Sequence, residues 1–368
     1  MFKVALVCGA RPNFMKIAPV LAAIGKSGRI TPYLVHTGQH YDEKMSQSFF
    51  DVLRIPRPDV DLGVGSGSHA EQTAKIMVEF EKVCLREKPL MVVVVGDVNS
   101  TLACAIVAKK LWIPVAHVEA GLRSGDMRMP EEINRIVTDS ISDLFFTTEP
   151  EGNENLLRFG ADKDRVHFVG NVMIDSLLQN REAAEKIPVL EEMEVESGKY
   201  CLVTMHRPSN VDDPEVLGPL LDVFAKIQEK IKIVFPAHPR TMSMIGKFGF
   251  SDKIKKMTRV RFCEPLDYHR TLKLNAHSRF VMTDSGGLQE ETTALGIPCL
   301  TIRENTERPV TVTIGTNEVV GSSPEKILLA VDRILAGSWK KGGMPEGWDG
   351  KASERIVSIL ESFLGKAR

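Results

Sequence analysis

The chain has 368 residues, more than one hydrophobic core usually serves, and this length predicts two domains. Its composition, 43% hydrophobic and 26% charged, is that of an ordinary globular protein. The formal net charge of -1 gives no electrostatic reason to expect nucleic acid or an anionic membrane as a partner, so an anionic ligand has to be held by local basic groups.

The cysteines and the N-terminus bear on the compartment. The six cysteines are scattered and form no C-x-x-C pair, which argues against a disulfide scaffold or a thiolate zinc site and fits a reducing compartment. The apolar stretch in MFKVALVCGARPN is too short for a signal peptide, and no run reaches the length that spans a bilayer. We therefore expect a soluble, cytoplasmic protein without a membrane or nucleic-acid partner.

In the first half, short runs of β-branched residues alternate with helical patterns, which predicts a parallel sheet with crossover helices. Helical patterns occur at 70–88 and 100–112. The runs near 92–95 and 143–148 are apolar without alternation, as expected of strands covered on both faces. The predicted strands are residues 2–8, 30–36, 91–96, 115–119, 143–148 and 166–170.

The polar segment 180–199 has no strand pattern, and the alternation of strands and helices restarts after it. We expect an α/β protein with one Rossmann-like domain over 1–172 and a second over 173–352, and a C-terminal helix within 353–368 that packs back on the first. Two such domains facing each other leave a cleft at the carboxyl ends of their strands, where α/β sheets bind ligands. The predicted strands of the second half are residues 200–205, 231–237, 260–264, 279–284 and 298–302.

Carboxylates lie at the ends of two consecutive strands of the first half. Asp97 and Glu119 are each explained, taken alone, as a helix cap or as the partner of an arginine. Because both lie at the face where such sheets bind ligands, proton chemistry is an equally good explanation. Glu131 and Glu132 instead follow Pro130 in a helix start, where acidic side chains complement the helix dipole. Spacing alone therefore gives these two glutamates a structural role.

The segment RFVMTDSGGLQEETTALG carries a candidate anion site. Ser285, Gly286 and Gly287 form a turn before a helix, where backbone N–H groups approach an anion and the helix dipole assists. An ordinary βα loop is the alternative. Glu291, in the first turns of the same helix, is placed to reach the hydroxyl pair of a ribose.

Basic residues follow several strands and form a candidate phosphate-binding rim. A lone histidine is more often a structural hydrogen-bond donor, but two basic pairs after two strands of one domain favour the rim. The candidates are Arg11, Lys16, His206, Arg207, His238, Arg240 and Arg308.

Several motifs of known chemistry do not occur in the sequence. The first strand is followed by GARPN rather than G-x-G-x-x-G, and there is no G-x-x-x-x-G-K-[ST] loop, no H-E-x-x-H and no Cys/His cluster with metal spacing. We therefore expect no cofactor and no metal, and tightly bound NAD, an ATP-driven step and zinc-activated water are disfavoured.

The motifs GARPNFMKIAP, GDVNSTLA, HVEAGLRSGD, MPEEINR, HRPSNVDDPE, TDSGGLQEE and TERPV, in this order, resemble those of the UDP-N-acetylglucosamine 2-epimerases over almost the whole chain. The resemblance implies a GT-B-like fold and a homodimer that needs neither metal nor redox cofactor. It also implies the interconversion of UDP-GlcNAc and UDP-ManNAc, which supplies ManNAc units for surface polysaccharide.

The route proposed for this family expels UDP from C1 while a base takes the C2 proton, and then adds UDP back to 2-acetamidoglucal after protonation from the opposite face. By resemblance, Asp97, Glu119 and Glu131 form the acid/base group, and which of them takes the proton stays open. The resemblance also implies that His206 and Arg11, with Lys16 nearby, contact the pyrophosphate as it leaves. It implies a phosphate cradle of Ser285, Gly286 and Gly287, a ribose contact of Glu291 and completion of the site by Arg308. Gln39 and His40 would hold a second, activating UDP-GlcNAc.

The chain departs from the family pattern at the uracil position, where an aromatic residue often stacks and only Thr271 or Leu272 is available. Four other functions stay open. A hydrolysing 2-epimerase would release ManNAc and UDP, and a 2-epimerase of a modified UDP-sugar would use the same chemistry. A GT-B glycosyltransferase needs no carboxylates around C2, and a nucleotide-sugar sensor would explain the basic rim but not the three carboxylates together.

Overall fold

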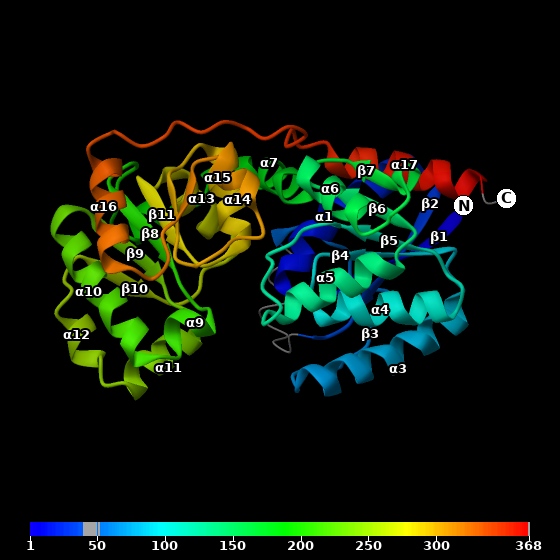
Figure 1. Cartoon of the computed structure of the whole chain (residues 1–368), viewed down its shortest axis with the longest axis horizontal. Helices are drawn as coiled ribbons and strands as arrows, with labels where there is room; N and C mark the ends of the chain where they lie inside the picture. The colour runs from blue at the N-terminus through cyan, green and yellow to red at the C-terminus, as the bar shows by residue number, and fades with distance from the viewer. Residues whose placement is uncertain (40–49, 51, 367–368) are drawn as a thin grey trace. The chain divides into compact units, whose positions relative to one another are not determined.

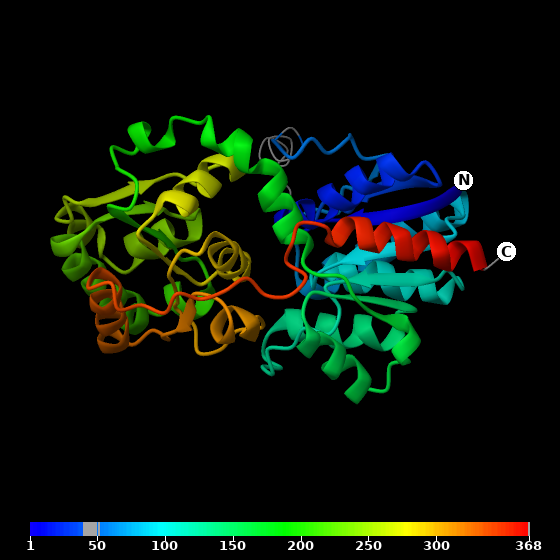
Figure 2. The same cartoon turned by 90° about the horizontal axis from the view of Figure 1, so that it is seen from above.

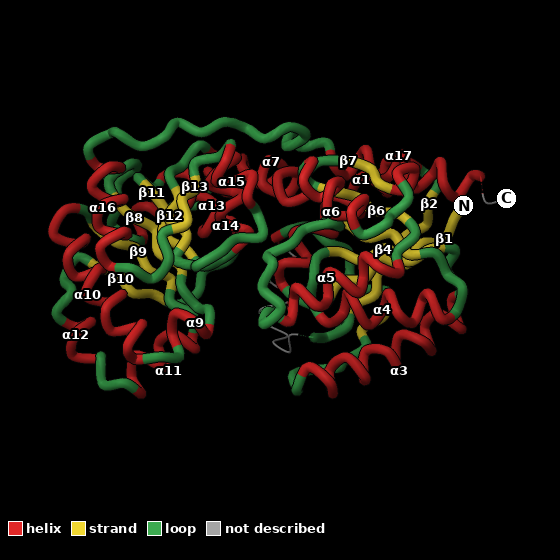
Figure 3. The backbone as a smooth tube through the Cα atoms, viewed as in Figure 1, coloured by secondary structure: helices red, strands yellow, loops and turns green. Residues whose placement is uncertain are grey.

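The structure, a computed structural model, describes residues 1–39, 50 and 52–366. The chain divides into two compact units, Met1–Gln179 with Glu346–Arg368, and Asn180–Pro345. Each unit is a parallel sheet with helices on both faces (Figures 1 and 3). Among the described residues, no helix is long and apolar enough to cross a membrane.

In the part of the first unit that the structure describes, seven parallel strands follow the order β3-β2-β1-β4-β5-β6-β7. The order reverses between β1 and β4, so the loops after these two strands diverge and leave room for a ligand. The run MVVVV of β4 is buried throughout, as its lack of alternation predicts. The strands are β1 (Phe2–Cys8), β2 (Ile30–His36), β3 (Val60–Asp61), β4 (Met91–Val95), β5 (Val115–Val118), β6 (Leu144–Thr147) and β7 (Val166–Phe168).

The C-terminal helix belongs to the first unit and packs against its first helix (Figure 2). Its start is fixed by Asp175, whose carboxylate accepts the backbone N–H groups of Ala352 at 3.1 Å and Ser353 at 2.7 Å. The helices are α1 (Arg11–Ser27), α3 (His69–Glu87), α4 (Asn99–Lys110), α5 (Pro130–Ile141), α6 (Pro150–Arg158), η1 (Lys163–Arg165), α17 (Ala352–Lys366), and α7 (Val172–Glu185), which continues into the second unit.

The second unit repeats this topology. Its described strands follow the order β10-β9-β8-β11-β12-β13, with the reversal between β8 and β11. The strands are β8 (Tyr200–Thr204), β9 (Lys232–Pro236), β10 (Val260–Cys263), β11 (Phe280–Thr283), β12 (Cys299–Thr301) and β13 (Asn317–Val319). The helices are α8 (Val189–Glu192), α9 (Pro208–Val211), α10 (Pro214–Lys230), α11 (Pro239–Lys247), α12 (Ser251–Lys255), α13 (Tyr268–His277), α14 (Gly286–Leu295), α15 (Pro309–Thr313) and α16 (Pro324–Leu335).

The prediction of an α/β protein with two Rossmann-like sheets is confirmed. Each predicted strand matches an observed strand, with ends that differ by no more than two residues. Two strands, β3 and β13, were not predicted. Both are very short and lie at a sheet edge, where one neighbouring strand is enough to hold them and no long apolar run marks them.

Candidate active site

Charged side chains meet at the carboxyl ends of β1, β4 and β5 in the first unit. Lys16, on α1, forms an ion pair with Glu119, which directly follows β5, and both side chains are buried. Glu119 has a φ of 69°, a left-handed conformation that is costly for a residue other than glycine and recurs at functional sites. The lysine ammonium also approaches Gly96 so closely that a Cβ there would lie 2.8 Å from it. The chain therefore holds this ion pair tightly against the end of β4.

The second predicted carboxylate, Asp97, follows β4 and is held by Arg135 from α5. The Nη2 atom of Arg135 lies 2.6 Å from Asp97, and its Nη1 atom lies 2.6 Å from Glu132. Glu132 in turn accepts the backbone N–H groups of Ser124 at 2.9 Å and Gly125 at 3.0 Å. Burial raises the pKa of Glu132, but these donors and the guanidinium outweigh it, so the pKa lies below the ordinary value of a glutamate. Glu132 thus fixes the loop after β5.

Glu131, the third predicted carboxylate, is half-buried in the first turn of α5. Asn134, one turn further along α5, donates from its side chain to the backbone carbonyl of Asp97 at 2.8 Å. This bond joins α5 to the end of β4. Asp97, Glu119 and Glu131 thus come from one unit, from the ends of two neighbouring strands and from the helix that follows the second strand.

Sequence reasoning missed a buried network under these carboxylates. His117, in β5, lies 2.7 Å from Asp139 through Nδ1 and 2.8 Å from the carbonyl oxygen of Gly96 through Nε2. Asp139, on α5, also accepts the backbone N–H of Gly121 at 3.1 Å and the guanidinium of Arg123 at 2.6 Å. The one available signal was a histidine inside the apolar strand VAHV, since a buried polar side chain needs partners.

The predicted activator residues are only partly described. The side-chain oxygen of Gln39 accepts the backbone N–H of Ser100 at 3.2 Å and its hydroxyl at 2.6 Å, so this glutamine is bound to the first turn of α4. His40 lies outside the described residues. Arg11 begins α1 directly after β1, and its side chain also lies outside the part of the chain that the structure describes.

In the second unit, His206 follows β8 and lies beside the end of β11. Its Nδ1 atom is 3.1 Å from the carboxylate of Asp284, which also accepts the backbone N–H groups of His206 at 2.9 Å and Arg207 at 2.8 Å. Burial raises the pKa of Asp284, but the histidine and these donors outweigh it and keep the pKa below its ordinary value. The imidazole is about half exposed, so Asp284 orients it towards solvent. Sequence reasoning had not singled out Asp284.

The predicted phosphate cradle lies at the start of α14. Gly286 and Gly287 are its first two residues, while the backbone N–H of Ser285 is donated to the hydroxyl of Thr283 at 2.9 Å. A Cβ on Gly286 would lie 2.6 Å from a carboxylate oxygen of Glu307, so only glycine fits without a shift of that side chain.

The other two predicted residues of this unit are both buried, Glu291 within α14 and Arg308 against it. Glu291 accepts the side-chain amide of Asn275 at 3.1 Å, and burial raises its pKa to about 7. The Nε atom of Arg308 lies 2.9 Å from Glu290 of α14. In residues 1–39, 50 and 52–366, no group of three or more His, Cys, Asp or Glu side chains is placed to hold a metal ion.

Two Rossmann-like units, each with charged side chains at the carboxyl ends of its strands, define an α/β enzyme of the GT-B-like class. The family model described as UDP-N-acetylglucosamine 2-epimerase matches residues 22–361, and the chain belongs to this family. The resemblance drawn from its motifs, and the isomerase class that this implies, are confirmed.

The relatives match nearly the full length of the chain. A UDP-N-acetylglucosamine 2-epimerase from Methanocaldococcus jannaschii is 44% identical over 97% of this chain and 98% of its own. A UDP-2,3-diacetamido-2,3-dideoxy-D-glucuronate 2-epimerase from Pseudomonas aeruginosa is 39% identical over 97% of this chain and 99% of its own. The crystal structure of M. jannaschii UDP-GlcNAc 2-epimerase in complex with UDP-GlcNAc and UDP has a TM-score of 0.90 and 43% identity, and the match covers 98% of this chain and 100% of that one.

Proposed function

We propose that the protein interconverts UDP-GlcNAc and UDP-ManNAc, and that Asp97, Glu119 and Glu131 supply its proton transfers. The observation that carries this proposal is the placement of Asp97 and Glu119 at the ends of neighbouring strands, each against a buried cation. The UDP-GlcNAc and UDP in the related M. jannaschii structure support the choice of substrate, because UDP is also the group that the reaction must release and take back.

The reaction needs no oxidant or reductant. A carboxylate takes the proton from C2, the C1–O bond breaks with its electron pair going to the β-phosphate of UDP, and a C1–C2 double bond forms. In the reverse sense, a carboxylic acid on the opposite face delivers a proton to C2 while a phosphate oxygen of UDP bonds to C1. The C2 hydrogen is only weakly acidic, so the two groups have to be held within hydrogen-bond reach of C2.

We assign the binding of UDP to the second unit. The first turn of α14, opened by Gly286 and Gly287, offers backbone N–H groups and the positive end of the helix dipole to a phosphate. His206, oriented by Asp284, and Arg308 add cationic or donor groups, and Glu291 is the proposed ribose contact. Arg11 and Lys16 are the proposed contributions of the first unit to the pyrophosphate, and Gln39 and His40 those to an activating UDP-GlcNAc.

A second substrate is favoured by one specific observation. The relative from P. aeruginosa, which is nearly as similar to this chain as the M. jannaschii relative, is described as an epimerase of a diacetamido glucuronate. The same elimination would invert C2 of that sugar. Side-by-side turnover of UDP-GlcNAc and the UDP-diacetamido glucuronate separates the two substrates.

Two further properties belong to this proposal. A homodimer is the assembly implied by the family resemblance, and sedimentation of the purified protein tests it. We place the enzyme in the cytoplasm, because all six of its cysteines have free thiols, as expected in a reducing compartment.

The test is incubation of UDP-GlcNAc with the protein in D2O. We expect deuterium at C2 while the sugar stays joined to UDP. An absence of exchange at C2 would rule out the epimerase function, whereas exchange with release of free sugar would establish the hydrolysing reaction. Asp97→Asn, Glu119→Gln and Glu131→Gln are each expected to abolish the exchange while UDP still binds, and near-normal turnover would remove that residue from the acid/base group.

A further inference from the structure

His117, which no step above uses, joins the ends of two strands through the buried network described above. The carbonyl oxygen of Gly96 can only accept a hydrogen bond, so the Nε2 atom of His117 carries a hydrogen and donates it. On its other side, His117 is bound to Asp139, whose second oxygen holds the backbone N–H of Gly121. His117 is fully buried, so water does not compete for these bonds.

The two backbone groups in this network adjoin the proposed catalytic carboxylates. Gly96 immediately precedes Asp97, and Gly121 lies two residues after Glu119. Both glycines have positive φ values, 66° and 81°, so their loops follow a path that few other residues adopt. The network therefore fixes the backbone on which each carboxylate is carried.

We propose that His117 and Asp139 are positioning residues that hold Asp97 and Glu119 in the geometry required for the two proton transfers. This inference rests on the proposed epimerase function, and neither residue is expected to touch the sugar. Proton transfer depends steeply on distance, and a displacement of about 1 Å can lower a rate about 100-fold. A loss of positioning is therefore measurable even in a protein that stays folded.

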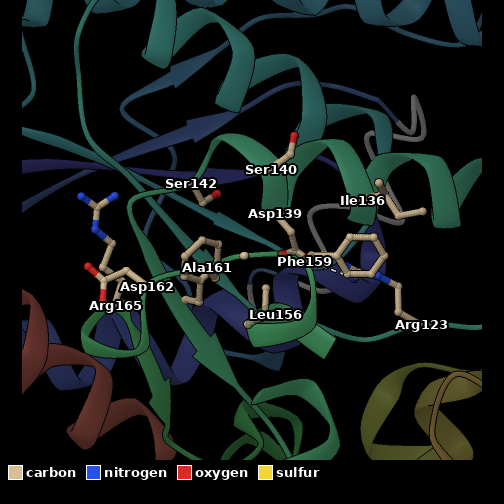
Figure 4. Close-up of a pocket in the computed structure, with 12 residues that line it drawn as sticks. Arg123, Ile136, Asp139, Ser140, Ser142, Leu156, Phe159, Ala161, Asp162 and Arg165 are labelled. Carbon is tan, nitrogen blue, oxygen red and sulfur yellow. Dashed lines mark hydrogen bonds and ion pairs between the residues drawn. The ribbon is translucent and has the colours of Figure 1, made fainter. Parts of the chain in front are cut away.

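The outer end of the network opens into a cavity. Arg123, which donates to Asp139, lines a pocket of about 370 Å³ together with residues of α5, β6 and the segment after α6 (Figure 4). Its guanidinium lies 5.2 Å from the centre of the Phe159 ring, and Figure 4 shows this ring beside it. Asp139 lines the same cavity, so removal of the Arg123 side chain would leave space beside its carboxylate.

Two variants of His117 test its hydrogen bonds to Asp139 and to Gly96 separately. In His117→Asn, the amide takes the place of Nδ1 and keeps the bond to Asp139 but does not reach Gly96. In His117→Gln, the amide takes the place of Nε2 and keeps the bond to Gly96. We expect His117→Asn to lower kcat for C2 exchange by about 100-fold, with KM and UDP affinity within threefold, and His117→Gln to recover part of this loss.

Asp143 offers a matched control at the opposite end of the same strand. Its carboxylate accepts the backbone N–H of Val115 and the ammonium of Lys109, both at 2.8 Å. Asp139→Asn and Asp143→Asn therefore weaken comparable contacts of β5, one at each end. We expect only Asp139→Asn to lower kcat of the folded enzyme. Equal kcat in the two variants, with only the melting temperature lowered, would overturn the inference.

Restoring activity by adding a guanidinium compound to a folded variant tests the network without any change in folding. Arg123 is partly accessible, so Arg123→Ala should fold and should leave a space that methylguanidinium can enter beside Asp139. We expect kcat of this variant to fall and then to rise at least tenfold with millimolar methylguanidinium, with no rise in the wild type or in Asp143→Asn. A lack of rescue would overturn the proposed positioning role of the contact between Arg123 and Asp139. Wild-type protein without any C2 exchange would instead defeat the proposed function.

Discussion

The guanidinium of Arg135 lies 2.6 Å from the carboxylate of Asp97 and 2.6 Å from that of Glu132, so one buried side chain links the loop after β4 to the glutamate that holds the loop after β5. A second nitrogen, Nε, also reaches Asp97, at 3.1 Å. The planar fork of an arginine suits this double contact, which a lysine ammonium does not reproduce. Asp97 is therefore held in orientation as well as neutralised.

We expect Arg135→Lys to lower kcat for C2 exchange by at least tenfold while the protein stays folded. A hydrogen bond to a charged group contributes about 1.5–3 kcal/mol, and the substitution removes at least one from Asp97 or Glu132. The exchange rate and the circular dichroism spectrum test this. Arg128→Lys is the control, because that arginine is exposed and its ion pair with Asp126 should contribute little. Equal loss of kcat in both variants would contradict the prediction.

The buried pair of Lys16 and Glu119 leads to a stability prediction. Lys16→Met keeps the length of the side chain but leaves the carboxylate of Glu119 without its ammonium, and removing one partner of a buried pair costs about 3–5 kcal/mol. We expect urea unfolding to show a loss of this size, and the double variant Lys16→Met/Glu119→Gln to recover most of it. Losses that simply add in the double variant would show that the two residues do not depend on each other.

Sequence reasoning found those residues of the site that directly follow a strand in the chain. Asp97 and Glu119 directly follow strands, and neighbouring parallel strands end at the same edge of a sheet, so an apolar run is enough to locate such residues. Gly286 and Gly287 were located in the same way, by the strand that precedes them.

The missed parts depend on packing between distant segments. Arg135 is 38 residues from Asp97, and Asp139 is 22 residues from His117. Both contacts depend on the rotation of α5 about its axis and on its position along the sheet. Arg135 lies four residues after Glu131 and three after Glu132, and its ion pair is with Glu132, which is buried whereas Glu131 is only half-buried.

Gly286→Ala tests the proposed phosphate site at the start of α14. The added Cβ would meet the carboxylate of Glu307 at 2.6 Å, so that side chain has to shift where the phosphate is proposed to bind. We expect UDP to bind at least tenfold more weakly, as measured by calorimetry. Gly246→Ala is the matched control, because this glycine also lies in a helix of the second unit and a Cβ there meets nothing within 4 Å. Unchanged UDP affinity in Gly286→Ala would place the phosphate elsewhere.

The raised pKa of Glu291 predicts opposite pH trends for stability and for binding. Burial raises this pKa from 4.5 to about 7, so between these values the folded protein holds a proton that the unfolded chain has lost. The free energy of unfolding should therefore fall as the pH rises from about 4.5 to 7, by at most about 1.4 kcal/mol per pH unit from this group.

UDP binding should follow the other trend, because the hydroxyl groups of a ribose donate best to an ionised carboxylate. We expect the affinity for UDP to weaken as the pH falls below about 7, where the buried Glu291 takes up its proton. Glu291→Gln cannot titrate, so it should bind UDP more weakly at pH 8 and lose most of the pH dependence between 6 and 8. Calorimetry over this pH range measures both effects. A pH dependence that persists in Glu291→Gln would assign it to another group and would leave the ribose contact of Glu291 without support.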